Sequence, residues 1–319
     1  MIKKIFFFFF LFISFNSSFS QLSKTHYIPP LTSGPSNADP LDQWFYISTP
    51  INGDVSFKIS PVGFPDQELS YIVNNTNPKK IQIASAGYSQ LFQDPATTSS
   101  VTSDKGYIIE ASDVIYVSIR MNAGGGAQAG ALVSKGDNGL GTTFRIGTYD
   151  NQGNPGDNYM NFFSVMATQD NTTVNLSSNN ISGLVIQNYG GQFPVENIIL
   201  NRGESYTVAL KVTDSNGNRD GLIGTLVSAD KNVVVNSGSA NGSFGNGGAR
   251  DYGIDQIVGL DKIGKEYIFV KGEGQDSYEN VLIVAHYDET EIKINGGSTE
   301  ATINKGQYYI IEGDKFTDG

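Results

Sequence analysis

Apolar and polar residues alternate along most of the chain, and a period of two is typical of half-buried β-strands. Val55, Phe57 and Ile59 are separated by single polar residues, and successive side chains of a strand point to opposite faces of a sheet. Residues 281–285 are apolar throughout and predict a central strand that is buried on both faces. We find no convincing helical stripe, so the pattern predicts an all-β chain.

Asn-Gly pairs interrupt this pattern and predict tight hairpin turns, because both residues tolerate positive φ. The pairs are Asn52-Gly53, Asn138-Gly139, Asn216-Gly217, Asn241-Gly242 and Asn295-Gly296. Short strands between such turns predict tandem antiparallel β-sandwich-like repeats, with a β-propeller as the alternative. Residues 21–52 contain five prolines and predict an entry segment that lacks regular structure except for a short strand at 44–48.

One part of the pattern occurs twice. Residues 163–176 match residues 281–294 at a constant offset of 118 positions, with Ala, Asp and Thr recurring in place. Residues 201–208 match residues 304–311 at an offset of 103, so the first copy carries 15 additional residues between 177 and 200. A strand, an acidic turn and a second strand are therefore built twice, as in a repeat protein.

Weaker sequence similarities extend the repeat beyond these two copies. Residues 105–109 resemble 305–309, and residues 132–135 resemble 226–229. The predicted β region is 53–319, with units at about 53–160, 161–279 and 280–319. Because the third unit is incomplete, we expect this chain to be the front of a longer polypeptide.

The first twenty residues predict a secretory signal peptide. Lys3 and Lys4 precede nine apolar residues at 5–13, and small residues stand before Gln21. A helix of nine residues rises only ~14 Å, about half the thickness of a bilayer core, so a membrane anchor is the weaker interpretation. We expect cleavage after Ser20 and no membrane insertion afterwards.

The net charge and the absence of cysteine exclude or disfavour some classes of function. Removal of residues 1–20 changes the formal net charge from −11 to −13, which disfavours nucleic acid as a partner. The chain has no cysteine, so thiol chemistry and disulfide stabilisation are excluded and buried apolar area must supply the stability.

Several short motifs resemble one known family. They are the Ala-x-x-Asp-x-Thr hairpins at 167–176 and 285–294, the Gly-x-x-Tyr strands at 203–206 and 306–309, the stretch 228–238, Asp255-Gln256 followed by 264–267, and the entry 26–30. Together they resemble the IgGFc-binding protein N-terminal domain in the form found in exported proteins of gliding, Bacteroidetes-type bacteria. The chain departs from the family pattern at Asn232, where proline is usual, and at Ile263, where an aromatic residue often stands.

The resemblance implies an IgGFc-binding-like interaction protein that is secreted or displayed at the cell surface. It also implies export by a type IX secretion system, through a domain beyond residue 319, and a link to adhesion and gliding motility. It does not imply antibody binding.

Candidate catalytic chemistry is sparse. The two histidines are His26, in the entry segment, and His286, predicted on a strand, and both are interpreted as structural. No Gly-x-Ser-x-Gly motif is present. The acids Asp170 and Asp288 stand at equivalent turns of a repeat, and a catalytic pair repeated in each unit is improbable. They are predicted to cap turns through backbone hydrogen bonds.

Two loops suggest ligands but fit no template. Residues 214–221 space oxygen donors as calcium loops do, yet Arg219 stands at the glycine position of that template, so a hairpin tip is the simpler interpretation. The glycine cluster at 122–130 lacks a following Gly-Lys-Ser/Thr and is interpreted as a loop. No catalytic, metal-ligating or cofactor-binding residue is assigned.

Two functions remain open. The favoured one is a non-catalytic interaction or adhesion module whose partner is an extracellular protein or glycan. The alternative is the carbohydrate-binding region of an exported polysaccharide-acting enzyme, because 16 tyrosines and Trp44 offer stacking faces beside polar groups.

Overall fold

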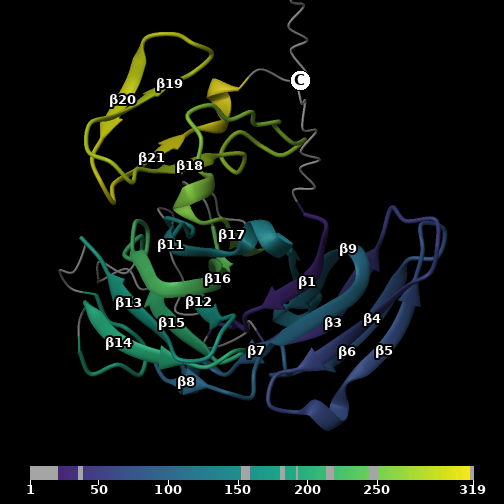
Figure 1. Cartoon of the computed structure of the whole chain (residues 1–319). Helices are drawn as coiled ribbons and strands as arrows, with labels where there is room; N and C mark the ends of the chain where they lie inside the picture. The colour runs from purple at the N-terminus through teal and green to yellow at the C-terminus, as the bar shows by residue number, and fades with distance from the viewer. Residues whose placement is uncertain are drawn as a thin grey trace, which may run out of the picture.

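The computed structural model describes residues 21–34, 39–151, 159–179, 184–191, 193–212, 219–243 and 251–316. Within these ranges the chain forms twenty-one β-strands, and its helical elements are 3-10 turns of three or four residues. The prediction of an all-β fold is confirmed. Figure 1 shows the strands in three groups that follow the colour gradient from purple to yellow.

The first group surrounds one long strand. Its strands are β1 (Ser23–Ile28), β2 (Leu31–Thr32), β3 (Pro40–Ser48), β4 (Val55–Pro61), β5 (Leu69–Val73), β6 (Lys79–Ala86), β7 (Phe92–Gln93), β8 (Val101–Thr102), β9 (Tyr107–Ala123) and β10 (Gln128–Val133). The first half of β9 pairs with β1 and β4, and its second half pairs with β3 and β10. The first hydrophobic core contains Val55, Phe57 and Ile59, so the predicted alternation is confirmed.

The second group repeats this plan. Its strands are β11 (Gly141–Arg145), β12 (Tyr159–Ala167), β13 (Thr172–Ser177), β14 (Val195–Leu200), β15 (Ser205–Val212), β16 (Leu226–Gly242) and β17 (Asp251–Ile257). The long strand is now β16, whose first half pairs with β11 and β13 and whose second half pairs with β12 and β17. A short parallel pairing between β10 and β17 joins the two groups.

The third group has four strands in two separate pairs. Its strands are β18 (Val281–Val284), β19 (Thr290–Lys293), β20 (Thr299–Ile303) and β21 (Tyr308–Ile311). β18 pairs with β21 and β19 pairs with β20. Ala285, Ile292, Ile303 and Ile311 form a small third core, which Figure 1 shows above the other two groups.

The strand register of β12–β15 is the same as that of β18–β21. The equivalent pairs are Met166–Ser205 and Val284–Tyr308 in one ladder, and Thr172–Leu200 and Thr290–Ile303 in the other. Each pair is related to its equivalent by the offsets of 118 and 103 residues seen in the sequence. The copied sequence therefore specifies a copied strand pairing.

Two sequence expectations on strands were wrong. The entry segment is not irregular, because β1 and β3 form within it. Pro29 and Pro30 separate β1 from β2, and Pro40 is the first residue of β3, where a missing N–H is tolerated. The apolar run at 281–284 is not a central strand among the described residues, since it pairs with β21 alone and is only half-buried.

Most of the Asn-Gly pairs that the structure describes do not form the expected turns. Only Asn295-Gly296 combines φ values of 51° and 69° between two paired strands. Asn138-Gly139 ends a 3-10 turn, and Asn241 takes a φ of 56° inside β16, where the register with β17 shifts. Asn also favours positive φ at a bulge or a 3-10 terminus, so the dipeptide alone did not identify hairpins.

Candidate functional site

The repeated acids bridge facing turns. Asp170 Oδ1 accepts the backbone N–H of Arg202 at 2.9 Å, and Asp288 Oδ1 accepts that of Lys305 at 3.1 Å. The prediction that these carboxylates satisfy backbone amides is confirmed, with one correction. The amide belongs to the facing turn and not to the turn that carries the acid, so each carboxylate holds two turns together.

The bonds around each acid are also duplicated. Asn201 Oδ1 accepts the N–H of Asn171 at 3.2 Å, and Asn304 Oδ1 accepts that of Glu289 at 3.0 Å. The backbone N–H groups of the two asparagines donate to Glu204 at 2.7 Å and to Gln307 at 2.8 Å, respectively. The acceptor is the carboxylate of Glu204 in one copy and the side-chain amide of Gln307 in the other. This position therefore requires a hydrogen-bond acceptor but no charge.

His26 is fully buried in a polar network between the first two groups. Its Nε2 faces the carbonyl oxygens of Ile115 at 3.0 Å and Ser23 at 3.3 Å, so it carries the proton and donates. Its Nδ1 lies 2.9 Å from Ser134 Oγ. Burial lowers the pKa of His26 to about 4 against the raising effect of these carbonyls. The ring is therefore a neutral structural element.

Gln256 extends the same network. Its Oε1 accepts the backbone N–H of Lys135 at 2.7 Å, and its Nε2 donates to the carbonyl of Tyr27 at 3.0 Å and to Asn236 Oδ1 at 3.2 Å. One glutamine thus links the entry strand β1, the end of β10 and the long strand β16. The sequence marked Gln256 only as part of a family-like motif.

His286 lies where the second and third groups meet. It follows β18 in a bend instead of lying on the strand as expected, and its Nδ1 accepts a hydrogen bond from Arg145 Nε at 3.4 Å. Desolvation, with Arg145 close by, lowers the pKa of His286. Arg145 Nη1 donates to the carbonyl of Gly224 at 2.6 Å, so this pair joins two strand groups and presents no nucleophile.

The remaining sequence candidates give no chemical site. Residues 122–130 form the turn between β9 and β10, in which Gly124, Gly125 and Gly126 take positive φ. The signal segment 1–20 and residues 214–218 of the possible calcium loop lie outside the described residues. In the ranges that are described, no group of three or more His, Asp or Glu side chains could hold a metal ion, and no helix could cross a membrane.

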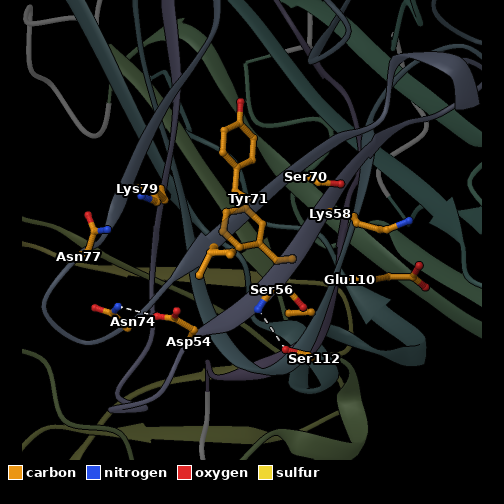
Figure 2. Close-up of a pocket in the computed structure, with 13 residues that line it drawn as sticks. Asp54, Ser56, Lys58, Ser70, Tyr71, Asn74, Asn77, Lys79, Glu110 and Ser112 are labelled. Atoms are coloured by element: carbon orange, nitrogen blue, oxygen red, sulfur yellow. Dashed lines mark hydrogen bonds between the residues drawn. The ribbon is translucent and has the colours of Figure 1, made fainter.

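An open depression of about 900 Å³ lies on the β4–β5–β9 sheet and is the best candidate for a binding site (Figure 2). We call it the β4–β5 depression. Its lining residues are Asp54, Ser56, Phe57, Lys58, Ser70, Tyr71, Ile72, Asn74, Asn77, Lys79, Glu110, Ala111 and Ser112. Because β5 is the last strand of the sheet, the depression lies at an edge that other parts of the described chain leave open.

Tyr71 supports this depression from the core face of the sheet. Its ring stacks on the buried Phe57 with centroids 5.6 Å apart and an interplanar angle of 24°, and Figure 2 shows its hydroxyl pointing away from the sheet. The neighbouring Ile72 is 52% exposed. Since successive side chains of a strand point to opposite faces, Ile72 lies on the outer face with Lys58 and Ser70, and an exposed aliphatic side chain among polar groups is typical of the centre of an interface.

Charged groups of both signs surround this apolar centre. Lys58 Nζ lies 2.7 Å from Glu68 Oε1, and the hydrogen bond to Glu68 raises the pKa of Lys58. Glu110 is paired with Arg202 at 2.8 Å, while Asp54 accepts a hydrogen bond from Asn74 at 2.9 Å. The rim is therefore polar and mixed in charge, which suits a polar protein surface better than a polyanion or a polycation.

The tryptophan that the sequence suggested for sugar stacking lies elsewhere. Trp44 lies on the outer face of β3, and Lys80 Nζ sits 4.1 Å from the centroid of its ring. Tyr46, two residues along the same face, has Lys80 at 5.6 Å and Arg120 at 5.6 Å. Cations already contact these rings, so they are less open for stacking than the composition implied.

The sequence did not single out Ile72, Lys58 or Arg145. The alternation of 55–60 places Lys58 on the solvent face, but only the pairing of β4 with β5 and β9 brings it near Ser70 and Glu110. An exposed apolar residue in the next strand, Ile72, was the one local signal that could have pointed to this surface.

Comparison with known proteins gives one match. The IgGFc binding protein family model matches residues 129–317, which include all of β10 except its first residue and all later strands from β11 to β21. No curated protein and no solved structure matches the chain. The match covers more than half of the chain.

Proposed function

This chain belongs to the IgGFc binding protein family, and we propose that it is a secreted or surface-displayed, non-catalytic interaction module that binds an extracellular protein at the β4–β5 depression. The observation that carries this proposal is Ile72, an aliphatic side chain that is 52% exposed on the outer face of β5 and framed by a polar rim. A central anchor within such a rim is the usual anatomy of a protein interface.

Preorganisation supports the choice of this surface. β4 is paired on both sides, by β5 and β9, and Phe57 is buried in the first core. A ligand that contacts Ile72 would therefore lose little free energy to ordering the protein. The depression is open and shallow, as a surface for a folded partner or an extended peptide must be, and it does not enclose a small molecule.

A carbohydrate ligand is the second candidate, and one observation favours it. The depression is lined by side chains that can hydrogen-bond hydroxyl groups, among them Asn77 and Ser70. Against it, the ring of Tyr71 packs against the first core and the rings of Trp44 and Tyr46 carry cations, so the depression offers a sugar chain no open aromatic platform.

The export and cellular location of the protein are part of the same proposal. We propose cleavage after Ser20, export as part of a longer polypeptide, and an origin among gliding, Bacteroidetes-type bacteria with type IX secretion. The basic start and short apolar core of residues 1–13 support the first of these. N-terminal sequencing of protein collected outside the cell tests it, and an intact Met1 there would contradict it.

A binding array separates the two ligand classes. Purified protein from residue 21 is applied to immobilised extracellular proteins, including immunoglobulin Fc, and in parallel to immobilised glycans, and hydrolysis is assayed on the glycans that bind. The proposal expects retention on at least one protein and no turnover. Retention on glycans alone would favour the second candidate, and turnover abolished by a single Asp or Glu substitution would show an enzyme.

A further inference from the structure

A stretch of strand-forming residues lies uncovered between the second and third groups. Residues 265–270 follow the 3-10 turn η5 (Leu260–Lys262), and all six are exposed. The exposed fractions of Ile268 and Val270 are 90% and 86%, and those of Tyr267 and Phe269 are 61% and 49%. Four consecutive apolar side chains in water are costly, so this segment is built to be covered.

The backbone of this segment is extended and unpaired. The rings of Tyr267 and Phe269 stack with centroids 6.3 Å apart, which places alternate residues on one face, as in a strand. Among the described residues, no backbone hydrogen bond is formed by residues 265–270. A strand with both rows of backbone groups open is a template for pairing.

The second group contains a strand, β11, that is equivalent to residues 265–270 and shows which strand such a segment pairs with. There the order is the long strand β9, then β10, the 3-10 turn η4 (Gly136–Gly139) and β11; here it is β16, then β17, η5 and residues 265–270. Gly141-x-x-Phe144 opens β11, and Gly264-x-x-Tyr267 opens this segment. β11 pairs antiparallel with the next long strand, β16, and Phe144 is buried by it. By this equivalence, we expect residues 265–270 to pair with a further long strand, as β11 pairs with β16.

The third group lacks the same partner at two other edges. In the second group β16 pairs with β12 and β13 as well as with β11. The equivalents of β12 and β13 are β18 and β19, and within the described chain each pairs with one neighbour only. The three strand edges that are open in the third group are therefore equivalent to the three edges that pair with β16 in the second group.

Burial gives the same result independently. Phe163, Val165 and Leu176 of the second core have no exposed area. Their equivalents at the offset of 118 are Val281, Ile283 and Ile294, which are only partly buried at the margin of the third core. The side chains that a long strand covers in one copy are uncovered in the other, so one missing element explains all these positions.

We propose that residues 265–270, β18 and β19 form an acceptor for a single long β-strand of the same polypeptide, placed after residue 319. Its pattern is that of β16, and its first half runs antiparallel to residues 265–270. The offset of 103 residues carries Leu226, the first residue of β16, to position 329. This strand converts the third group from two loose pairs into a closed unit like the second.

The acceptor can be tested with a donor taken from the chain itself. Appending a copy of residues 217–242 after Gly319 places the copy of β16 at position 329. A matched control carries the same extension with Val233→Pro and Val235→Pro in the appended copy, which removes two ladder donors and keeps the length and most of the composition. Amide hydrogen exchange is followed at residues 265–270 and 281–284 in the unextended chain, the extended chain and the control.

In the unextended chain we expect residues 265–270 to exchange at the rate of an unstructured peptide. In the extended chain their exchange should slow by about 100-fold or more, together with that of residues 281–284, and the proline control should not slow it. Equal exchange in the extended chain and the control would overturn the proposal. Protection in the unextended chain that grows with protein concentration would also overturn it, because a second copy would then be the occupant.

Discussion

Replacement of the buried histidine should remove a defined part of the acid sensitivity of this protein. The ring of His26 is fully buried and neutral, because Nε2 donates to two carbonyl oxygens and Nδ1 lies against Ser134 Oγ. Protonation of Nδ1 would place a cation in a site that burial makes unfavourable. His26→Gln keeps a polar side chain there and removes the titration.

The size of the effect follows from the pKa. Burial lowers the pKa of His26 from 6.5 to about 4, so between these values the unfolded chain binds a proton that the folded chain does not. Stability is therefore lost as the pH falls from about 6.5 to about 4, and no further loss from this group follows below that. A shift of this size corresponds to about 3 kcal/mol of unfolding free energy.

Urea unfolding of the wild type and His26→Gln, from about pH 4 to about pH 7, measures this contribution. Carboxylates and His286 titrate in both proteins, so they cancel in the difference between the two unfolding free energies. We expect His26→Gln to be less stable near neutral pH, where it loses hydrogen bonds, and the difference to shrink by about 3 kcal/mol towards pH 4. Parallel pH profiles would refute the reasoning, because the folded state would then protonate His26 without cost.

Three further substitutions test the packing of the repeated groups. Asp170→Ala and Asp288→Ala should each lower the unfolding free energy by about 0.5–2 kcal/mol in denaturant titrations, because one backbone amide loses its acceptor, whereas Asn at either position should restore most of the loss; equal melting of the Ala variants and the wild type would contradict this. Gly224 has a φ of 82°, and a Cβ there would lie 1.9 Å from the carbonyl oxygen of Gly306. Gly224→Ala should therefore cost more than about 2 kcal/mol by thermal melting, while Gly53→Ala, which meets nothing within 4 Å, should melt like the wild type.

Sequence reasoning identified the strands well where one face is buried. The alternation at 55–60 and the copied hairpins follow from side-chain contacts of near neighbours, which a linear pattern records directly. It failed where a residue's role depends on distant strands. Residues 281–284 were interpreted as a central strand from their composition, but the described chain gives them one neighbour.

The candidate site was less accessible to such reasoning. Ile72 became a candidate only because β5 pairs with β4 and places it opposite Ser56, on the face that carries Lys58, and no spacing in the sequence encodes that pairing. Trp44 was suggested by composition, yet Lys80 covers its ring from the neighbouring strand β6. Burial and strand pairing decide which aromatic residues remain available, and neither is a local property.

The measurement that tests the proposed function most directly is the affinity of Ile72→Ala for the protein ligand found on the array, compared with wild type and with Ile199→Ala. Ile199 is a matched control because it is 51% exposed, against 52% for Ile72, and lies on β14, outside the β4–β5 depression. We predict that Ile72→Ala raises Kd by about tenfold or more, as expected for an anchor worth at least ~1.4 kcal/mol, while Ile199→Ala leaves it unchanged. Equal Kd values for Ile72→Ala and the wild type would contradict the account.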